Sequence, residues 1–250
     1  MEATHGQGLQ VQPLFPLAVG LVQRRPDPLD LAIQIQEIRA LQNGANSNPD
    51  PGCAWTGDLN CCWQLHRNTC FQPLLKELIA FVGTYLDELG FNRQALVLHL
   101  QRCWPVVSEP GQVVGRHHHP NAHLSGVYYL TGNGTPRSGC LRLFPLRQAN
   151  ELVPGLGVGH GGPIGADSPG ARRWIAPWHD ISPLAGQLVV FPASIDHCVL
   201  ENRDSESRIS LSFDLVLSAP HAQEGGAPPE YLAPHPLDWQ PIGEDGPLSA

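Results

Sequence analysis

The most unusual stretch of the chain, residues 116–130, reads RHHHPNAHLSGVYYL. A histidine run precedes a proline, and the apolar and aromatic residues that follow are typical of a strand. Because side chains on a strand alternate between its two faces, His117 and His119 are expected to point to one side and His118 to the other. Two imidazoles on one face form half of a metal site, and nitrogen ligands suit iron, zinc, copper or nickel.

A second histidine-bearing segment lies downstream, where Asp196 and His197 follow an apolar run at residues 187–191. If the fold brings this segment to His117 and His119, three imidazoles converge on one position. The alternative is that the histidine run is a solvated surface loop, and the residues alone leave both interpretations open.

Composition narrows the class of protein. The chain has 250 residues, with 15 Lys and Arg against 23 Asp and Glu, a net charge of −8. This balance argues against nucleic acid as a partner, because binding to phosphate backbones needs a basic stripe. No apolar run reaches the roughly 18–20 residues of a membrane span. The 7 cysteines, without an export signal, are expected to be reduced thiols in a cytoplasmic protein.

Two helices are predicted ahead of a β-rich half. Apolar residues recur at helical spacing over residues 30–42 and 71–89, whereas the prolines within residues 1–28 are expected to keep that segment extended. Beyond residue 95 the segments are short, apolar and separated by glycine or proline. Strands are predicted over residues 95–104, 111–119, 124–130, 140–144, 187–191 and 208–217.

This order of elements predicts a mainly β (α+β) fold, a barrel or double-sheet jelly roll supported by N-terminal helices. We expect one domain over residues 1–218, with 1–94 as the helical support and 95–218 as the barrel. Residues 219–250 are expected to form a proline-rich C-terminal tail. A glycine-rich loop at 153–173 is either a lid over a site or an insertion without function.

Arg208 opens the last predicted strand, in which apolar residues alternate with polar ones. The polar face carries Ser210, Ser212 and Asp214. An arginine that points into a barrel is costly unless an anion meets it, and a guanidinium matches a carboxylate. The alternative is an arginine at the sheet edge that reaches water.

The order of these segments resembles the 2-oxoglutarate/Fe(II)-dependent oxygenases (2OG oxygenases), most closely the prolyl-hydroxylase-like branch and an uncharacterised group of oxygenases within it. The segments that carry the resemblance are 117–130, 139–145, 184–192 with 196–199, and 208–213. The resemblance implies a double-stranded β-helix, which is a jelly-roll or cupin-like barrel.

The resemblance also implies a site. Fe(II) would be held by His117, His119 and His197, and the 2-oxoglutarate cosubstrate by Arg208, Tyr129 and Ser125. His119 occupies the position where the family carries a carboxylate ligand. It therefore stays open whether His119 ligates the metal, and whether the site prefers another divalent ion.

The activity that the resemblance implies is that of a dioxygenase, which hydroxylates a C–H bond and releases succinate and CO2, with ascorbate as a candidate reductant. No catalytic side chain is expected beyond the metal centre. The substrate is a small molecule or a protein side chain. Two alternatives stay open: a cupin-like metal barrel that does not use 2-oxoglutarate, and a degenerate binding module without catalysis.

Overall fold

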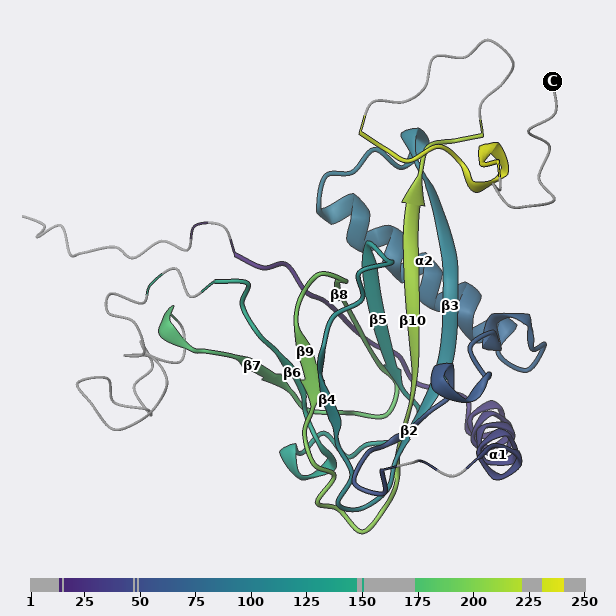
Figure 1. Ribbon diagram of the computed structural model, residues 1–250, viewed down its shortest axis with the longest axis vertical. Coiled ribbons are helices and arrows are strands. Elements are labelled where there is room, and N and C mark those ends of the chain that lie inside the picture. The colour runs from purple at the N-terminus through teal and green to yellow at the C-terminus, as the bar shows by residue number, and fades with distance from the viewer. Residues whose placement is uncertain are drawn as a thin grey trace, which may run out of the picture.

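The computed structural model describes residues 14, 16–46, 48, 50–147, 150, 174–221 and 231–240 (Figure 1). Two antiparallel sheets face each other, and helices cover one of them. Within these ranges, no helix has the length and apolar character that a membrane crossing demands.

The larger sheet has six strands in the order β1-β8-β5-β10-β3-β2. Its strands are β1 (Gly20–Gln23), β2 (Trp55–Thr56), β3 (Val97–Ser108), β5 (Leu124–Tyr129), β8 (Gln187–Pro192) and β10 (Arg208–Ser218). The smaller sheet has four strands in the order β4-β9-β6-β7. Its strands are β4 (Val114–His117), β6 (Leu141–Leu143), β7 (His179–Ile181) and β9 (His197–Val199). This is the double-stranded β-helix type of jelly roll, so the predicted fold class is confirmed.

The two helices are α1 (Pro28–Gly44) and α2 (Gln72–Glu88). In Figure 1, α2 lies across the larger sheet behind β5, β10 and β3. The apolar stripe of α2 packs on one face of β10, whose contributing residues are Ile209, Leu211, Phe213, Leu215 and Leu217. Burial of this face stabilises the packing of the helix on the sheet, because apolar area removed from water contributes roughly 25 cal/mol per Å².

Strand alternation sends the other face of β10 toward the smaller sheet. Arg208, Ser210 and Ser212 line a cavity there. Strand β5 lies close to the Phe213 side chain of β10. Gly126 of β5 pairs with Phe213, and a Cβ on Gly126 would lie 2.2 Å from the Phe213 ring. A larger residue at 126 would therefore push β5 away from the strand that carries the polar face.

Several elements differ from the sequence prediction. Helix α1 begins at Pro28, not inside the predicted range, because the Asp27 side chain caps it by accepting from the backbone N–H of Leu29 at 2.9 Å. A proline at the first helical position loses no hydrogen bond, so Pro28 starts the helix and does not block it. Strand β4 is shorter than predicted. The strands β1, β2, β7 and β9 were missed, and each has four residues or fewer.

The predicted loop 153–173 lies outside the described residues. Parts of the predicted tail are described, and they return to the barrel. The ring of His235 contacts that of His99 in β3, with 4.9 Å between centroids, and within the tail the backbone N–H of Ala219 donates to the carbonyl of Ala233 at 2.8 Å. That residues 219–250 form a unit separate from the barrel stays a prediction.

Candidate functional site

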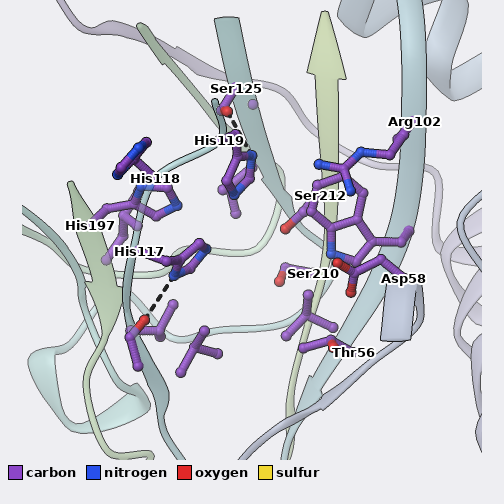
Figure 2. A pocket seen from close by; sticks show the side chains of 18 of the residues that line it. Thr56, Asp58, Arg102, His117, His118, His119, Ser125, His197, Ser210 and Ser212 are labelled. Carbon is purple, nitrogen blue, oxygen red and sulfur yellow. Dashed lines mark hydrogen bonds between the residues drawn. The ribbon is translucent and has the colours of Figure 1, made fainter. Parts of the chain in front are cut away.

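Three histidines meet at one end of the barrel. His117 ends β4 and is the register partner of His197, the first residue of the neighbouring β9. His119 follows two residues after His117, and its ring stacks on that of His117 with 5.1 Å between centroids. One ring nitrogen from each of the three lies within 4.8 Å of the others. Figure 2 shows the three rings gathered at one side of the pocket.

Hydrogen bonds orient each of these rings in the same way. Nδ1 of His117 lies 2.8 Å from the Gly115 carbonyl, and Nδ1 of His197 lies 2.9 Å from the Ile195 carbonyl. Nδ1 of His119 lies 2.6 Å from Oδ1 of Asp214. Carbonyl and carboxylate oxygens only accept, so each Nδ1 carries the hydrogen. In a neutral ring with the hydrogen on Nδ1, Nε2 has a free lone pair, which is the form of imidazole that binds a metal ion.

The electrostatics favour neutral imidazoles in the cluster. Burial lowers the pKa of His197 to about 4, with a further contribution from the neighbouring His117. Burial also lowers the pKa of His117 below its usual value. At neutral pH the rings of His117 and His197 are therefore uncharged, so no proton has to be removed before these two ligate a cation.

His118 does not join the cluster. Its Nδ1 lies 3.1 Å from Oδ1 of Asp196, a carboxylate that also pairs with Arg116 at 2.8 Å. His118 and His119 lie beyond the end of β4, and the two rings have different partners, Asp196 and Asp214.

Asp214 of β10 is a site residue that the sequence analysis did not assign. It is fully buried, and it accepts hydrogen bonds from His119, from the Ser125 hydroxyl at 3.0 Å and from Arg102. Burial alone would raise the pKa of the Asp214 carboxyl, but the hydrogen bonds from His119 and Arg102 outweigh it and lower the pKa. Asp214 therefore holds a negative charge directly behind a ring of the cluster. The alternation of β10 placed it on the polar face, and this was the available signal.

Ser125 lines the same cavity, but its hydroxyl hydrogen is already donated within the protein. It donates to Oδ1 of Asp214 and lies 3.0 Å from Nδ1 of His119. The position expected to face a cosubstrate thus braces the pair formed by His119 and Asp214.

Arg208 lies at the other end of the cavity and is 2% exposed. Its Nη1 donates to the carbonyl of Gly139 at 2.9 Å, and its Nε has no hydrogen-bond partner in the described part of the chain. Gly139 has a positive φ of 81°, and a Cβ there would lie 3.0 Å from Nη1 of Arg208 and 2.4 Å from the Leu200 carbonyl. A glycine is therefore needed where the backbone approaches the guanidinium.

No carboxylate among the described residues forms an ion pair with Arg208. The nearby Tyr129 is fully buried, and burial raises its pKa to about 12, so its hydroxyl keeps its proton. Burial lowers the pKa of Arg208, because desolvation disfavours its charged form. A buried guanidinium without an anion is costly, and the five donors of its planar fork suit a carboxylate.

A cavity of about 520 Å³ connects the two ends. Its walls also include Thr56, Asp58, Trp104, Phe191, Ser210 and Ser212. Asp58 was not anticipated: it comes from a short 3-10 helix ahead of the barrel, and its Oδ1 is buried without a partner among the described residues. The sequence offered no signal for Asp58, because nothing in the polar loop that carries it fixes its place beside the barrel.

Comparison with known proteins agrees with this geometry. Residues 102–214 match the family described as "Putative 2OG-Fe(II) oxygenase". The matched segment contains the three clustered histidines, Arg208 and Asp214, and it is similar to the 2-oxoglutarate/Fe(II)-dependent oxygenases. The resemblance inferred from the sequence is confirmed.

Solved structures share the fold. The alpha ketoglutarate dependent epimerase SnoN from nogalamycin biosynthesis is 16% identical with a TM-score of 0.56, over 89% of this chain and 92% of that chain. The carbocyclase SnoK from the same biosynthesis is 13% identical with a TM-score of 0.55, over 84% and 85%. A Pseudomonas putida prolyl-4-hydroxylase is 18% identical with a TM-score of 0.50, over 79% and 92%. Among curated proteins, no sequence matches the chain.

Proposed function

We propose that this protein is a non-haem Fe(II)- and 2-oxoglutarate-dependent dioxygenase that hydroxylates a C–H bond and releases succinate and CO2. The observation that carries the proposal is one cavity with a three-histidine cluster at one end and, at the other, a buried arginine that meets no carboxylate among the described residues. A dicarboxylic acid with a metal-binding keto acid at one end fits both.

Fe(II) would be held by the Nε2 atoms of His117, His119 and His197. The donor set fits the ion, because imidazole nitrogens suit iron and three protein ligands leave positions open. When bound together with 2-oxoglutarate, the iron supplies activation of O2 coupled to oxidative decarboxylation of the cosubstrate. The protein orients the ligands through their Nδ1 hydrogen bonds. In support, SnoN has a structure in complex with Fe3+ and alpha ketoglutarate.

Arg208 would bind the carboxylate of 2-oxoglutarate that lies away from the metal. Tyr129 keeps its proton, so it can donate a hydrogen bond to the same carboxylate. Ser125 would close the cavity wall between the two ends. The wall of β8 and β6 around this carboxylate is apolar, which excludes water and strengthens the attraction to the guanidinium.

The substrate is a small molecule or a protein side chain. A cavity of about 520 Å³ holds a small cosubstrate and leaves room for only a limited part of a second molecule. We propose hydroxylation as the reaction, with ascorbate as a reductant that keeps the iron in its ferrous state. Because the structural relatives include an epimerase and a carbocyclase, product analysis has to establish the outcome.

The test is release of succinate from 2-oxoglutarate by the purified full chain loaded with Fe(II). Arg208→Ala should weaken 2-oxoglutarate binding about 100-fold, since removing one partner of a buried charge pair costs roughly 2–5 kcal/mol. The affinity of Arg208→Ala for the metal should change by less than about threefold, because the guanidinium is not one of the proposed metal ligands. Arg142→Ala, which removes a surface pair with Asp180, is the matched control.

An equal loss of metal and cosubstrate affinity in Arg208→Ala would contradict the assigned role. Absence of any metal-dependent binding or turnover of 2-oxoglutarate would end the proposal.

A second candidate is a cupin-like metal barrel that does not use 2-oxoglutarate. The all-histidine ligand set favours it, because the cluster itself contains no carboxylate. In that case the wild-type chain takes up metal but binds no 2-oxoglutarate, and Arg208→Ala leaves any metal-dependent activity unchanged. A chain that takes up no metal would instead be a binding module.

A further inference from the structure

We propose that Asp214 is a positioning residue of the metal centre, which fixes the His119 ring and places a negative charge behind it. The inference rests on the proposed function only in requiring that the histidine cluster bind a divalent metal. The three proposed ligands differ in the group that accepts the hydrogen bond from Nδ1.

The three rings are held by different acceptors. His117 and His197 each donate to a neutral backbone carbonyl two residues earlier in the chain. His119 alone donates to a carboxylate, at 2.6 Å, across 95 residues of sequence. Each of these carbonyls belongs to the same short segment as the ring that it orients, whereas the contact of His119 with β10 exists only because the fold brings two distant segments together.

The contacts of Asp214 fix which oxygen serves the metal site. Oδ1 accepts from His119 and from Ser125, and Oδ2 accepts from Arg102, including Nε at 3.1 Å. The side chain of Asp214 is 0% exposed, while that of Arg102 is 30% exposed. The inner oxygen therefore faces the ligand ring, and the compensating cation lies on the outer, partly solvated side.

This arrangement changes what His119 offers to a metal. A carboxylate that accepts from the remote N–H of an imidazole fixes the tautomer and raises the basicity of the ligating nitrogen. Three neutral imidazoles add no charge of their own, so a divalent ion held by them would keep its whole charge. Asp214 supplies a negative charge one hydrogen bond behind the ring, where low polarity of the surroundings strengthens its effect.

A purely structural role for Asp214 is the competing explanation. In that case it serves to anchor Arg102 of β3 to β10, and the contact with His119 is incidental. The two roles differ in what happens when Arg102 is removed. If Asp214 is only an anchor, losing either member of the pair has the same consequence for the metal site.

The experiment compares Asp214→Asn with Arg102→Gln in the metal-free full chain, using Co(II) as the probe and competition with a chromophoric chelator as the readout. Asparagine has one accepting oxygen, so it cannot satisfy His119 and Arg102 at once. Asp214→Asn should lower Co(II) affinity about 10- to 100-fold, the usual range for loss of such a partner. Arg102→Gln should leave the affinity within about threefold of wild type or raise it, because the charge on Asp214 is then less compensated.

The outcomes separate the proposals. If the wild type binds no Co(II), the proposed function fails at its first step. If the wild type binds and Asp214→Asn binds equally well, the positioning role is wrong while the metal site stands. If both variants weaken binding equally, Asp214 is only an anchor and the inference is overturned.

A measurement on the wild type covers the case in which Asp214→Asn does not fold. In the Co(II)-loaded protein, the ring N–H protons of metal-bound histidines give strongly shifted, solvent-exchangeable proton NMR signals. The His119 signal, assigned by its loss in His119→Ala or by selective labelling, should exchange with solvent far more slowly than the signal of His197, which is as buried but donates to a neutral carbonyl. Exchange of both at the same rate would overturn the inference.

Discussion

The two ends of the cavity are built on opposite principles. At the histidine end, every Nδ1 has an acceptor within the chain, and the rings are oriented before any ion arrives. At the Arg208 end, the buried guanidinium has one backbone acceptor and an Nε without a partner among the described residues. One end is preorganised for its ligand, and the other is left incomplete until an anion enters. The buried guanidinium therefore lowers the stability of the ligand-free protein. Substitutions in the histidine cluster should weaken metal binding, whereas replacing Arg208 should stabilise the ligand-free protein.

The largest effect is expected from removing a ligand at the preorganised end. His197→Ala should weaken Co(II) or Fe(II) binding about 100-fold or more, because sites with several protein ligands gain roughly 3 kcal/mol from each. Chelator competition measures this directly. His179→Ala, on the exposed part of β7, is the matched control and should bind metal as the wild type does. Wild-type affinity in His197→Ala would show that the cluster is not the site.

The pH dependence of the stability of the metal-free protein also tests the histidine end of the cavity. His197 has a usual pKa of 6.5, and burial lowers it to about 4 in the folded chain. Between these values the unfolded chain binds a proton that the folded chain does not. The free energy of unfolding should therefore fall by roughly 3 kcal/mol as pH drops from about 6.5 to about 4, and stay level above that range as far as this group is concerned. Urea unfolding of the wild type and of His197→Gln across this range isolates the contribution of His197 to the free energy of unfolding. The same pH dependence of stability in both proteins would contradict the lowered pKa of His197.

The incomplete end predicts an effect of the opposite sign. Arg208→Met keeps most of the side-chain volume and removes a buried charge that lacks a counter-ion among the described residues, so it should stabilise the ligand-free protein by about 1–3 kcal/mol. Thermal unfolding without 2-oxoglutarate measures the gain. Arg142→Met, at a paired surface arginine, should give no such gain. If Arg208→Met lowers the stability of the ligand-free chain, the guanidinium is not strained there.

The smallest effect is expected at Ser125. Ser125→Ala removes one hydrogen bond to Asp214 and leaves the contact of Asp214 with His119 in place. Stability should fall by about 0.5–1.5 kcal/mol, and metal affinity should change by less than about threefold. A loss of metal affinity as large as that of Asp214→Asn would assign the positioning role to the serine instead of the carboxylate.

The sequence predicted the class of fold, because the long segments carry enough residues to show their period. The alternation of β10 separated its apolar face from its polar face, and the stripe of α2 predicted the surface that covers it. The strands that were missed, such as β9 with three residues, are too short for any period to appear. They exist because the neighbouring strands provide partners, which is a property of the folded chain.

The part of the candidate site that could be predicted is the part in which residue type and short sequence spacing indicate a metal ligand. Strand spacing predicted that His117 and His119 point to one side, although β4 ends at His117. Asp214 was placed on the polar face, but its partner lies 95 residues away, and no local pattern encodes that distance. Asp58 comes from a short 3-10 helix that only the tertiary fold carries to the cavity. The parts of the site that escaped prediction are thus those held by long-range contacts.

The most direct test of the central claim is the affinity for 2-oxoglutarate measured by titration calorimetry with and without a metal. Ni(II) replaces Fe(II), so that no turnover occurs. If one ligand bridges the two ends, Ni(II)-loaded wild type should bind 2-oxoglutarate at least about tenfold more tightly than the metal-free chain, and Ni(II)-loaded Arg208→Ala should lose about 100-fold. Affinity that depends on neither the metal nor Arg208 would contradict the account.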